Sequence, residues 1–176
     1  MSYRDAEIID PGTRLNCIVG PNGTGKSTIL CAICLGLGGE PPLLGRADDA
    51  RTFIMHEKEV AIIEIELAPT RDKDGKPGPT NTVRRLIERN KGTERGRGKG
   101  ASTFYINGEV VNKKEVTKLV QETYLLSVDN LCTFLPQDRV GSFSGFDSKQ
   151  LLIETEKSMS GTKHLFTTHE ELIVME

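Results

Sequence analysis

Eight residues near the start of the chain, 20–27, have the types and spacing of a loop that binds phosphate groups. They read Gly-Pro-Asn-Gly-Thr-Gly-Lys-Ser, which fits the pattern G-x-x-x-x-G-K-[ST]. Its glycines can adopt the positive φ angles that turn successive backbone N–H groups toward one anion. Lys26 can reach the β- and γ-phosphates as a point charge, and the Ser27 hydroxyl can ligate Mg²⁺. The pattern therefore predicts a site for a nucleoside triphosphate.

The segments on either side of this loop are of the kinds that such a loop requires. Residues 15–19 form a short apolar run, which predicts a strand, and residues 28–37 are apolar at nearly every position, which predicts a helix buried on several sides. The N-terminus of that helix would face the phosphates, where its backbone N–H groups favour an anion. The order of strand, loop and helix makes a chance match of a Gly-rich turn the weaker interpretation.

Length and charge limit the other possibilities. A chain of 176 residues is long enough for one domain with a real core, and its formal net charge of −2 does not indicate a nucleic-acid binder by bulk electrostatics. Any contact with DNA would therefore be local. No apolar stretch reaches the roughly 18 residues of a membrane span, so no membrane partner is expected. The four cysteines lack the spacing of a secreted disulfide framework, which favours a reducing intracellular compartment.

An antiparallel meander is predicted to follow the helix. Residues 60–67 alternate toward their end, as expected of a strand with one solvent-exposed face, and residues 82–89 and 104–106 are further strand candidates. An Asn-Gly pair at 107–108 then gives a two-residue hairpin turn. The stretch 90–100 is polar, glycine-rich and basic. A solvated hairpin extension is the favoured interpretation of that stretch, and a contact with the DNA backbone is the alternative.

Segments later in the chain supply one more polar side chain of interest. Asn112 is predicted to cap a helix, with Glu115 completing a capping box. Residues 131–135 are predicted to form a buried strand, and Gln137 follows at its C-terminal end, where open α/β sheets place ligand groups. Ser148 is predicted to cap a last helix.

Cysteine and histidine residues offer no ligand or catalytic set. Cys31 and Cys34 form a C-x-x-C pair, but they lie inside an apolar helix with no second pair nearby in sequence. Buried packing is therefore favoured over a metal or redox role. The histidines, which are expected to be surface residues, are His56, His164 and His169.

The phosphate loop and Gln137 together resemble the ABC-type ATPases. The loop has their G-P-N-G-x-G-K-S form, Gln137 resembles their Q-loop, and the N-K-x-D motif of a GTPase is missing from the sequence. Five further segments resemble the N-terminal head of the structural maintenance of chromosomes (SMC) proteins. They are residues 31–39, 44–48, 130–132, 134–141 and 151–158. The implied fold is an α/β P-loop NTPase, an ABC-type (RecF/RecN/SMC-like) N-terminal lobe with an antiparallel β meander and helices, as part of an incomplete head.

The resemblance implies a role for each residue that matches a family motif. Lys26 and Gln137 would be the catalytic groups, since Gln137 corresponds to the glutamine that contacts Mg²⁺ and the attacking water. Mg²⁺ would be held by Ser27 and Gln137. Arg46 lies where these heads carry an arginine loop that senses DNA or contacts the nucleotide, although a surface arginine is an equally good interpretation. The implied ATP-binding residues are Pro21, Asn22, Gly23, Thr24, Gly25, Lys26, Ser27, Thr28 and Arg46.

The resemblance also implies partners. An ABC-type site is shared between two heads, and its Walker B strand and signature motif belong to a C-terminal lobe. This sequence has no apolar run ending in Asp-Glu and no S-G-G-x motif. The expected partners are that lobe of the same full-length protein, a second SMC head, non-SMC subunits, and DNA held by the assembled complex. The implied setting is the chromosome in the nucleus, in DNA repair, recombination and chromosome integrity.

Two consequences follow for this chain. Residues 1–160 would form the ATPase lobe and residues 161–176 the root of a coiled-coil arm, and an apolar face should remain exposed where another lobe completes the sheet. A nucleotide-binding module without turnover of its own is the alternative to an ATPase, because water activation needs groups that the motifs above do not include. A small-molecule kinase is a third and weaker interpretation.

Overall fold

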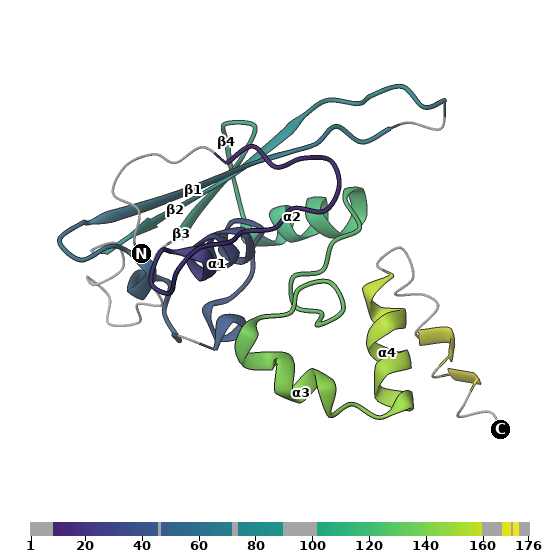
Figure 1. The fold of residues 1–176 in the computed structure, drawn as a ribbon. Coiled ribbons are helices and arrows are strands. Elements are labelled where there is room, and N and C mark those ends of the chain that lie inside the picture. The colour runs from purple at the N-terminus through teal and green to yellow at the C-terminus, as the bar shows by residue number, and fades with distance from the viewer. Residues whose placement is uncertain are drawn as a thin grey trace.

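A four-stranded antiparallel sheet forms one layer of the fold, and the helix that follows the phosphate loop packs against it. The computed structural model describes residues 9–45, 47–71, 74–89, 102–159, 167–169 and 171–172. Figure 1 shows α1 and α2 against the sheet, with α3 and α4 further from it. The helices are α1 (Lys26–Gly36), α2 (Lys113–Lys118), α3 (Val140–Ser144) and α4 (Ser148–Ser158). The strands are β1 (Val60–Leu67), β2 (Asn81–Glu88), β3 (Ser102–Ile106) and β4 (Glu109–Val111).

The predicted meander is confirmed, with the strands in the order β1-β2-β3-β4. One row across the sheet joins Ile63, Arg85 and Phe104, which lie opposite one another on neighbouring antiparallel strands. Because side chains alternate along a strand, all three point to the face that carries the core. The turn between β3 and β4 has φ 52° at Asn107 and φ 88° at Gly108, as a two-residue hairpin with the native twist requires.

The predicted helix after the phosphate loop is also confirmed as α1. It packs against β1 so closely that a Cβ added to Gly36 would lie 2.6 Å from Ile65 Cδ1 and 2.9 Å from Ile63 Cγ2. Ile33 is nevertheless 41% exposed. The sequence predicted burial on several sides of the helix, and the structure shows burial on one side only. The buried residues of α1 are Cys31, Cys34, Leu35 and Gly36.

Two later helices begin at capping boxes. Asn112 accepts a hydrogen bond from the backbone N–H of Glu115 at 3.0 Å, and the Glu115 carboxylate accepts one from the N–H of Asn112 at 2.8 Å, as predicted. Helix α4 is capped by Asp147, which pairs in the same reciprocal way with Gln150. The prediction that Ser148 caps this helix is therefore wrong by one residue, because the longer-reaching carboxylate before it occupies the cap position.

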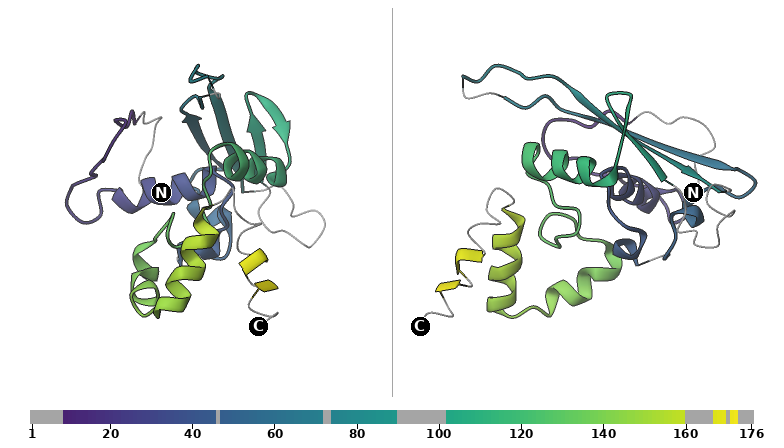
Figure 2. Two further views of the ribbon diagram at one scale, coloured as in Figure 1. Left: turned by 90° about the vertical axis from the view of Figure 1, so that its right-hand side faces the viewer. Right: turned by 180° about the vertical axis from the view of Figure 1, so that it is seen from behind.

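Two predicted strands are wrong. Residues 15–19 pair with no strand among the described residues, and an extended segment becomes a strand only when a neighbour pairs with it. Leu15 and Val19 are 96% and 85% exposed. Figure 2 (left) shows this segment, in purple, running apart from the sheet before it enters α1. Residues 131–133 form turns and residues 134–135 have no regular structure, since the N–H groups of Thr133 and Phe134 both donate to the carbonyl of Asn130. Apolar side chains are exposed at Leu15, Ile18 and Val19, while the apolar sheet face that another lobe would cover stays a prediction.

Some expectations fall on residues outside those that the structure describes. They are the role of Arg46, the basic stretch 90–100, the exposure of His164 and most of the predicted arm root at 161–176. Within the described ranges, no helix has the length and apolar character that crossing a membrane requires.

Candidate functional site

The phosphate loop has a backbone that side chains with a Cβ would strain. Gly23 has φ 84° and Gly25 has φ 97°, both in the left-handed region that favours glycine. Gly20 also lies in a confined position, because a Cβ there would come 3.0 Å from the Thr24 hydroxyl oxygen. That hydroxyl donates to the carbonyl of Pro21 at 2.8 Å and so closes the loop on itself. These contacts hold the loop in a tight arc that ends where α1 begins.

Lys26 spans this arc. Its ammonium donates to the carbonyls of Gly20 and Pro21, each at 2.7 Å. The side chain thus folds back over the loop that precedes it and places its ammonium beside residues 20 and 21, where the loop begins. A phosphate bound there would meet the ammonium and the backbone N–H groups of the first helical turn together.

The start of α1 is suited to an anion. Gly25 occupies the N-cap position, no side chain caps the helix, and its first turn contains no acidic residue. By contrast, α2 and α4 both have side-chain caps. The positive end of the α1 dipole therefore faces the phosphate loop without a side-chain carboxylate to neutralise it. This donor set fits the phosphates of a nucleotide, and the Ser27 hydroxyl is the kind of oxygen ligand that Mg²⁺ takes.

Gln137 lies in a different environment from the one predicted. It is exposed and begins a short 3₁₀ turn, Gln137–Arg139, with no strand before it. The turn packs near Gly45, where an added Cβ would come 3.2 Å from Asp138 Cβ. Among the described residues no hydrogen bond joins Gln137 to Ser27, so the predicted pair of Mg²⁺ ligands stays a prediction.

Cys31 and Cys34 are buried and behave as packing residues, whereas Cys17 and Cys132 are exposed. Cys34 is fully buried, and burial raises the pKa of its thiol to about 11, which keeps it protonated near neutral pH. Within the described ranges no group of cysteine, histidine and acidic residues is arranged to hold a metal ion. His56 is exposed, and His169 lies 2.9 Å from a carboxylate oxygen of Glu156.

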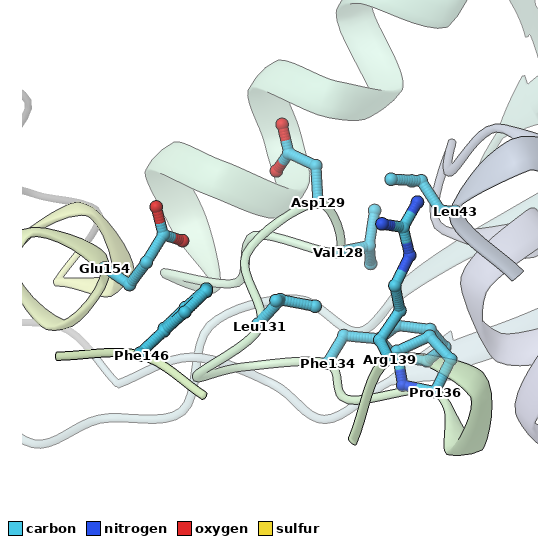
Figure 3. Close-up of a pocket in the computed structure, with 9 residues that line it drawn as sticks. All are labelled: Leu43, Val128, Asp129, Leu131, Phe134, Pro136, Arg139, Phe146 and Glu154. Carbon is cyan, nitrogen blue, oxygen red and sulfur yellow. The ribbon is translucent and has the colours of Figure 1, made fainter. Parts of the chain in front are cut away.

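A pocket of about 230 Å³ lies beside the Gln137 segment and away from the phosphate loop. Figure 3 shows the apolar side chains of Leu131 and Phe146 along its wall, with Glu154 toward one end, Arg139 toward the other and Asp129 between them. No residue of the phosphate loop lines it. The pocket is therefore distinct from the nucleotide site that the motif predicts.

Two buried polar residues that the sequence reasoning missed support the site. Arg85 is 5% exposed and donates to the carbonyls of Leu35 and Gly39 at the end of α1. Asn130, also 5% exposed, donates to the carbonyl of Glu154 at 2.9 Å and so ties the segment before Gln137 to α4. The signal for Arg85 was a charge at an inward position of an alternating strand, while nothing in the sequence distinguished Asn130.

Comparisons with known proteins agree with the motif. A family profile described as "AAA domain" matches residues 1–173. Structural maintenance of chromosomes protein 5 of Schizosaccharomyces pombe is 44% identical over 173 residues, which are 98% of this chain and 14% of the relative. The protein of the same name from Arabidopsis thaliana is 38% identical over 94% of this chain, and protein 6 of Saccharomyces cerevisiae is 33% identical over 77% of it. The chain thus spans 14% or less of the length of these relatives.

Solved structures agree with the fold. A structure titled "Structural biochemistry of ATP-driven dimerization and DNA stimulated activation of SMC ATPases" has a TM-score of 0.63 at 20% identity, over 86% of this chain and 88% of that one. An Smc head domain with a coiled coil from Pyrococcus yayanosii has a TM-score of 0.58 at 21% identity, over 78% of this chain and 26% of that one. The predicted fold class, an SMC-like lobe with an antiparallel meander, is confirmed.

Proposed function

Since the chain belongs to the AAA domain family and is similar over nearly its whole length to SMC protein 5, we propose that it is the ATP-binding N-terminal head lobe of a chromosome-maintenance ATPase. The observation that carries the proposal is the phosphate loop: a glycine arc closed by Lys26 at the start of α1, where no side chain caps the helix. A helix start with no side-chain cap and no acidic residue in its first turn favours an anion.

Each residue of the site has a defined task in this proposal. The first-turn N–H groups of α1 and the Lys26 ammonium hold the β- and γ-phosphates, with Asn22, Thr24 and Thr28 flanking them. Ser27 and Gln137 would hold Mg²⁺, which would supply positive charge to neutralise the phosphates. Lys26 exchanges its two carbonyl contacts for phosphate oxygens, so the group that closes the loop becomes the group that binds the ligand.

The larger assembly follows from the relatives. We infer that ATP joins this head to a second SMC head of the subunit-six type and that hydrolysis releases the two. The C-terminal lobe of the same full-length protein supplies the water-activating carboxylate, and non-SMC subunits and DNA complete the complex. The proposed setting is DNA repair and recombination on chromosomes in the nucleus, and Arg46 is a proposed contact to nucleotide or DNA.

A second candidate is a nucleotide-binding module without turnover. It is favoured by the acidic residues of β1, because Glu64 and Glu66 are both exposed and alternate with apolar neighbours on one strand. They do not follow an apolar strand as a catalytic pair would. Phosphate release after addition of the C-terminal lobe and a partner head separates the candidates, since the head lobe would then hydrolyse Mg·ATP and the module would still release no phosphate.

The decisive experiment compares Lys26→Ala with a matched surface variant. We expect wild type to bind a fluorescent ATP analogue with Mg²⁺, and Lys26→Ala to lose that binding, because two charge-assisted contacts to phosphate disappear. Lys118→Ala removes an equal charge from a side chain that is 71% exposed and pairs with Glu122, so it should bind as wild type does. Equal binding by both variants would contradict the site. Reconstitution with the C-terminal lobe and partner head should then give ATPase activity that Lys26→Ala abolishes.

A further inference from the structure

A buried arginine on β2 lies against the end of the phosphate-loop helix. Arg85 stands between Val83 and Ile87, at an inward position where strand alternation places apolar side chains. Its two neighbours on that face are fully buried, and Arg85 itself is 5% exposed. A guanidinium is costly to bury unless its donors are satisfied, so its contacts indicate what the residue does.

Those contacts join the helix end to the sheet. Nη1 of Arg85 donates to the carbonyl of Leu35 at 2.9 Å and to the carbonyl of Gly39 at 3.1 Å, while Nε donates to the Ser102 hydroxyl at 3.0 Å. The guanidinium carbon also lies 4.9 Å from the centre of the Phe104 ring. Within the described ranges Arg85 forms no ion pair with a carboxylate. Its hydrogen bonds go to two main-chain carbonyls and one hydroxyl.

The two carbonyls lie on either side of the point where α1 stops. Leu35 is in the last turn of the helix, and Gly39 follows the helix by three residues. The C-terminal end of a helix carries the negative end of its dipole, and the last turn of α1 contains no basic residue of its own. Arg85 supplies that cation from the sheet: Nη1 donates to both carbonyls, and the planar guanidinium lets Nε donate to the Ser102 hydroxyl of β3 at the same time.

Burial is unequal along α1. Residues 34–39 are all buried, whereas residues 20–24 of the phosphate loop are exposed and residues 25–30 are half-buried. The helix has 11 residues and is therefore about 16 Å long. Its axis is fixed at the C-terminal end, and Lys26 and Ser27 lie at the other end of the same rigid rod.

We propose that Arg85 is a positioning residue for the nucleotide site: it clamps the C-terminal end of α1 to β2 and β3, and so fixes the direction in which the phosphate loop is presented. This inference rests on the proposed function, because it assigns Arg85 an effect on ATP affinity. It assigns no contact between Arg85 and the nucleotide. A merely structural role would alter stability and leave affinity unchanged.

The test uses the 176-residue chain and three substitutions. Arg85→Gln removes the charge and leaves two of the five N–H donors, Arg85→Lys keeps the charge and loses the planar guanidinium, and Val120→Ala is a control. Val120 is 2% exposed and belongs to the core cluster around α2, so its truncation destabilises the fold without removing a hydrogen bond from α1. Binding of a fluorescent ATP analogue with Mg²⁺ and hydrogen exchange of peptides from residues 20–39 are measured well below each unfolding midpoint.

The expected pattern separates positioning from stability. Arg85→Gln should bind Mg·ATP about three- to tenfold more weakly than wild type, Arg85→Lys should fall between them, and Val120→Ala should keep wild-type affinity. Hydrogen exchange should rise in Arg85→Gln through residues 20–30 as well as 34–39. The proposal is overturned if exchange rises at 34–39 alone, or if Arg85→Gln binds ATP as tightly as Val120→Ala. If wild type binds no ATP the proposed function fails, and exchange at residues 20–30 still decides whether Arg85 fixes the loop.

Discussion

Replacing Gly36 by alanine tests how closely α1 must approach β1. Gly36 is the last residue of the helix, and an ideal Cβ would lie 2.9 Å from Ile63 Cγ2 and 2.6 Å from Ile65 Cδ1. Carbon atoms in contact prefer about 3.5–4.0 Å. The Ile65 atom is the end of a flexible side chain and can rotate away. The Ile63 atom is a branch methyl on a buried strand residue, which has little freedom to move.

Two effects of opposite sign decide the result. Alanine in place of glycine in a helix stabilises by about 0.5–1 kcal/mol through lower backbone entropy in the unfolded chain. Overpacking a close core contact costs about 1–3 kcal/mol, and the Ile63 contact is short by about 0.6 Å. Overpacking therefore wins, and Gly36→Ala should lower the free energy of unfolding by roughly 0.5–2 kcal/mol.

Urea unfolding followed by far-UV circular dichroism measures the effect, with Gly141→Ala as its control. Gly141 lies inside α3 with no atom within 4 Å of its ideal Cβ, so the same substitution gains helix propensity and meets nothing. We expect Gly141→Ala to be at least as stable as wild type and Gly36→Ala to be less stable. Equal midpoints for the two variants would refute the claim that α1 and β1 need glycine at their contact.

Two further predictions concern buried groups. Burial raises the pKa of the Cys34 thiol from 9.0 to about 11. Between pH 9 and 11 the thiol ionises in the unfolded chain but stays neutral in the folded one, so the free energy of unfolding should fall with rising pH. The fall should be up to about 1.4 kcal/mol per pH unit, and the contribution of Cys34 is complete below pH 9. Urea titrations of reduced protein at pH 8, 9 and 10 should show this slope in wild type beyond that of Cys34→Ala, and identical slopes would refute it. Asn130→Asp places a carboxylate where an amide donates to Glu154 at 2.9 and 3.3 Å, and should lower the free energy of unfolding by about 2–3 kcal/mol at pH 7. Hydrogen exchange over residues 148–158 should be faster in this variant, which would show that α4 has lost its contact with residue 130. Lys149→Ala, on the exposed face of α4, should not change this exchange.

The elements that the sequence predicted well are those with a local cause. The meander follows from alternating apolar residues and from one Asn-Gly pair whose positive φ angles only a few residue types tolerate. The α2 start follows from a capping box, in which Asn112 and Glu115 satisfy each other within four residues. The phosphate loop has the same character, because its glycines, Lys26 and the helix start lie within one short segment.

The parts that sequence reasoning missed depend on neighbours distant in the chain. Residues 15–19 have the composition of a strand, yet no described strand pairs with them. Residues 131–135 also have the composition of a strand, but the carbonyl of Asn130 accepts hydrogen bonds from two backbone N–H groups that a strand would use for pairing. Arg85 could not be assigned its task, because Leu35 lies 50 positions away and only the folded sheet brings the two together.

The contacts that fix the direction of the phosphate loop are at the far end of its helix. Gly36 sets the approach of α1 to β1, and Arg85 holds the carbonyls of Leu35 and Gly39. A helix behaves as a lever over this length: a tilt of about 4° at its fixed end displaces an atom about 15 Å away by about 1 Å. A displacement of that size at a phosphate site can change the reaction rate by up to about a hundredfold, even where it breaks only one or two contacts to the phosphate. Substitutions around residues 35–39 should therefore affect nucleotide affinity and turnover more than their cost in stability suggests.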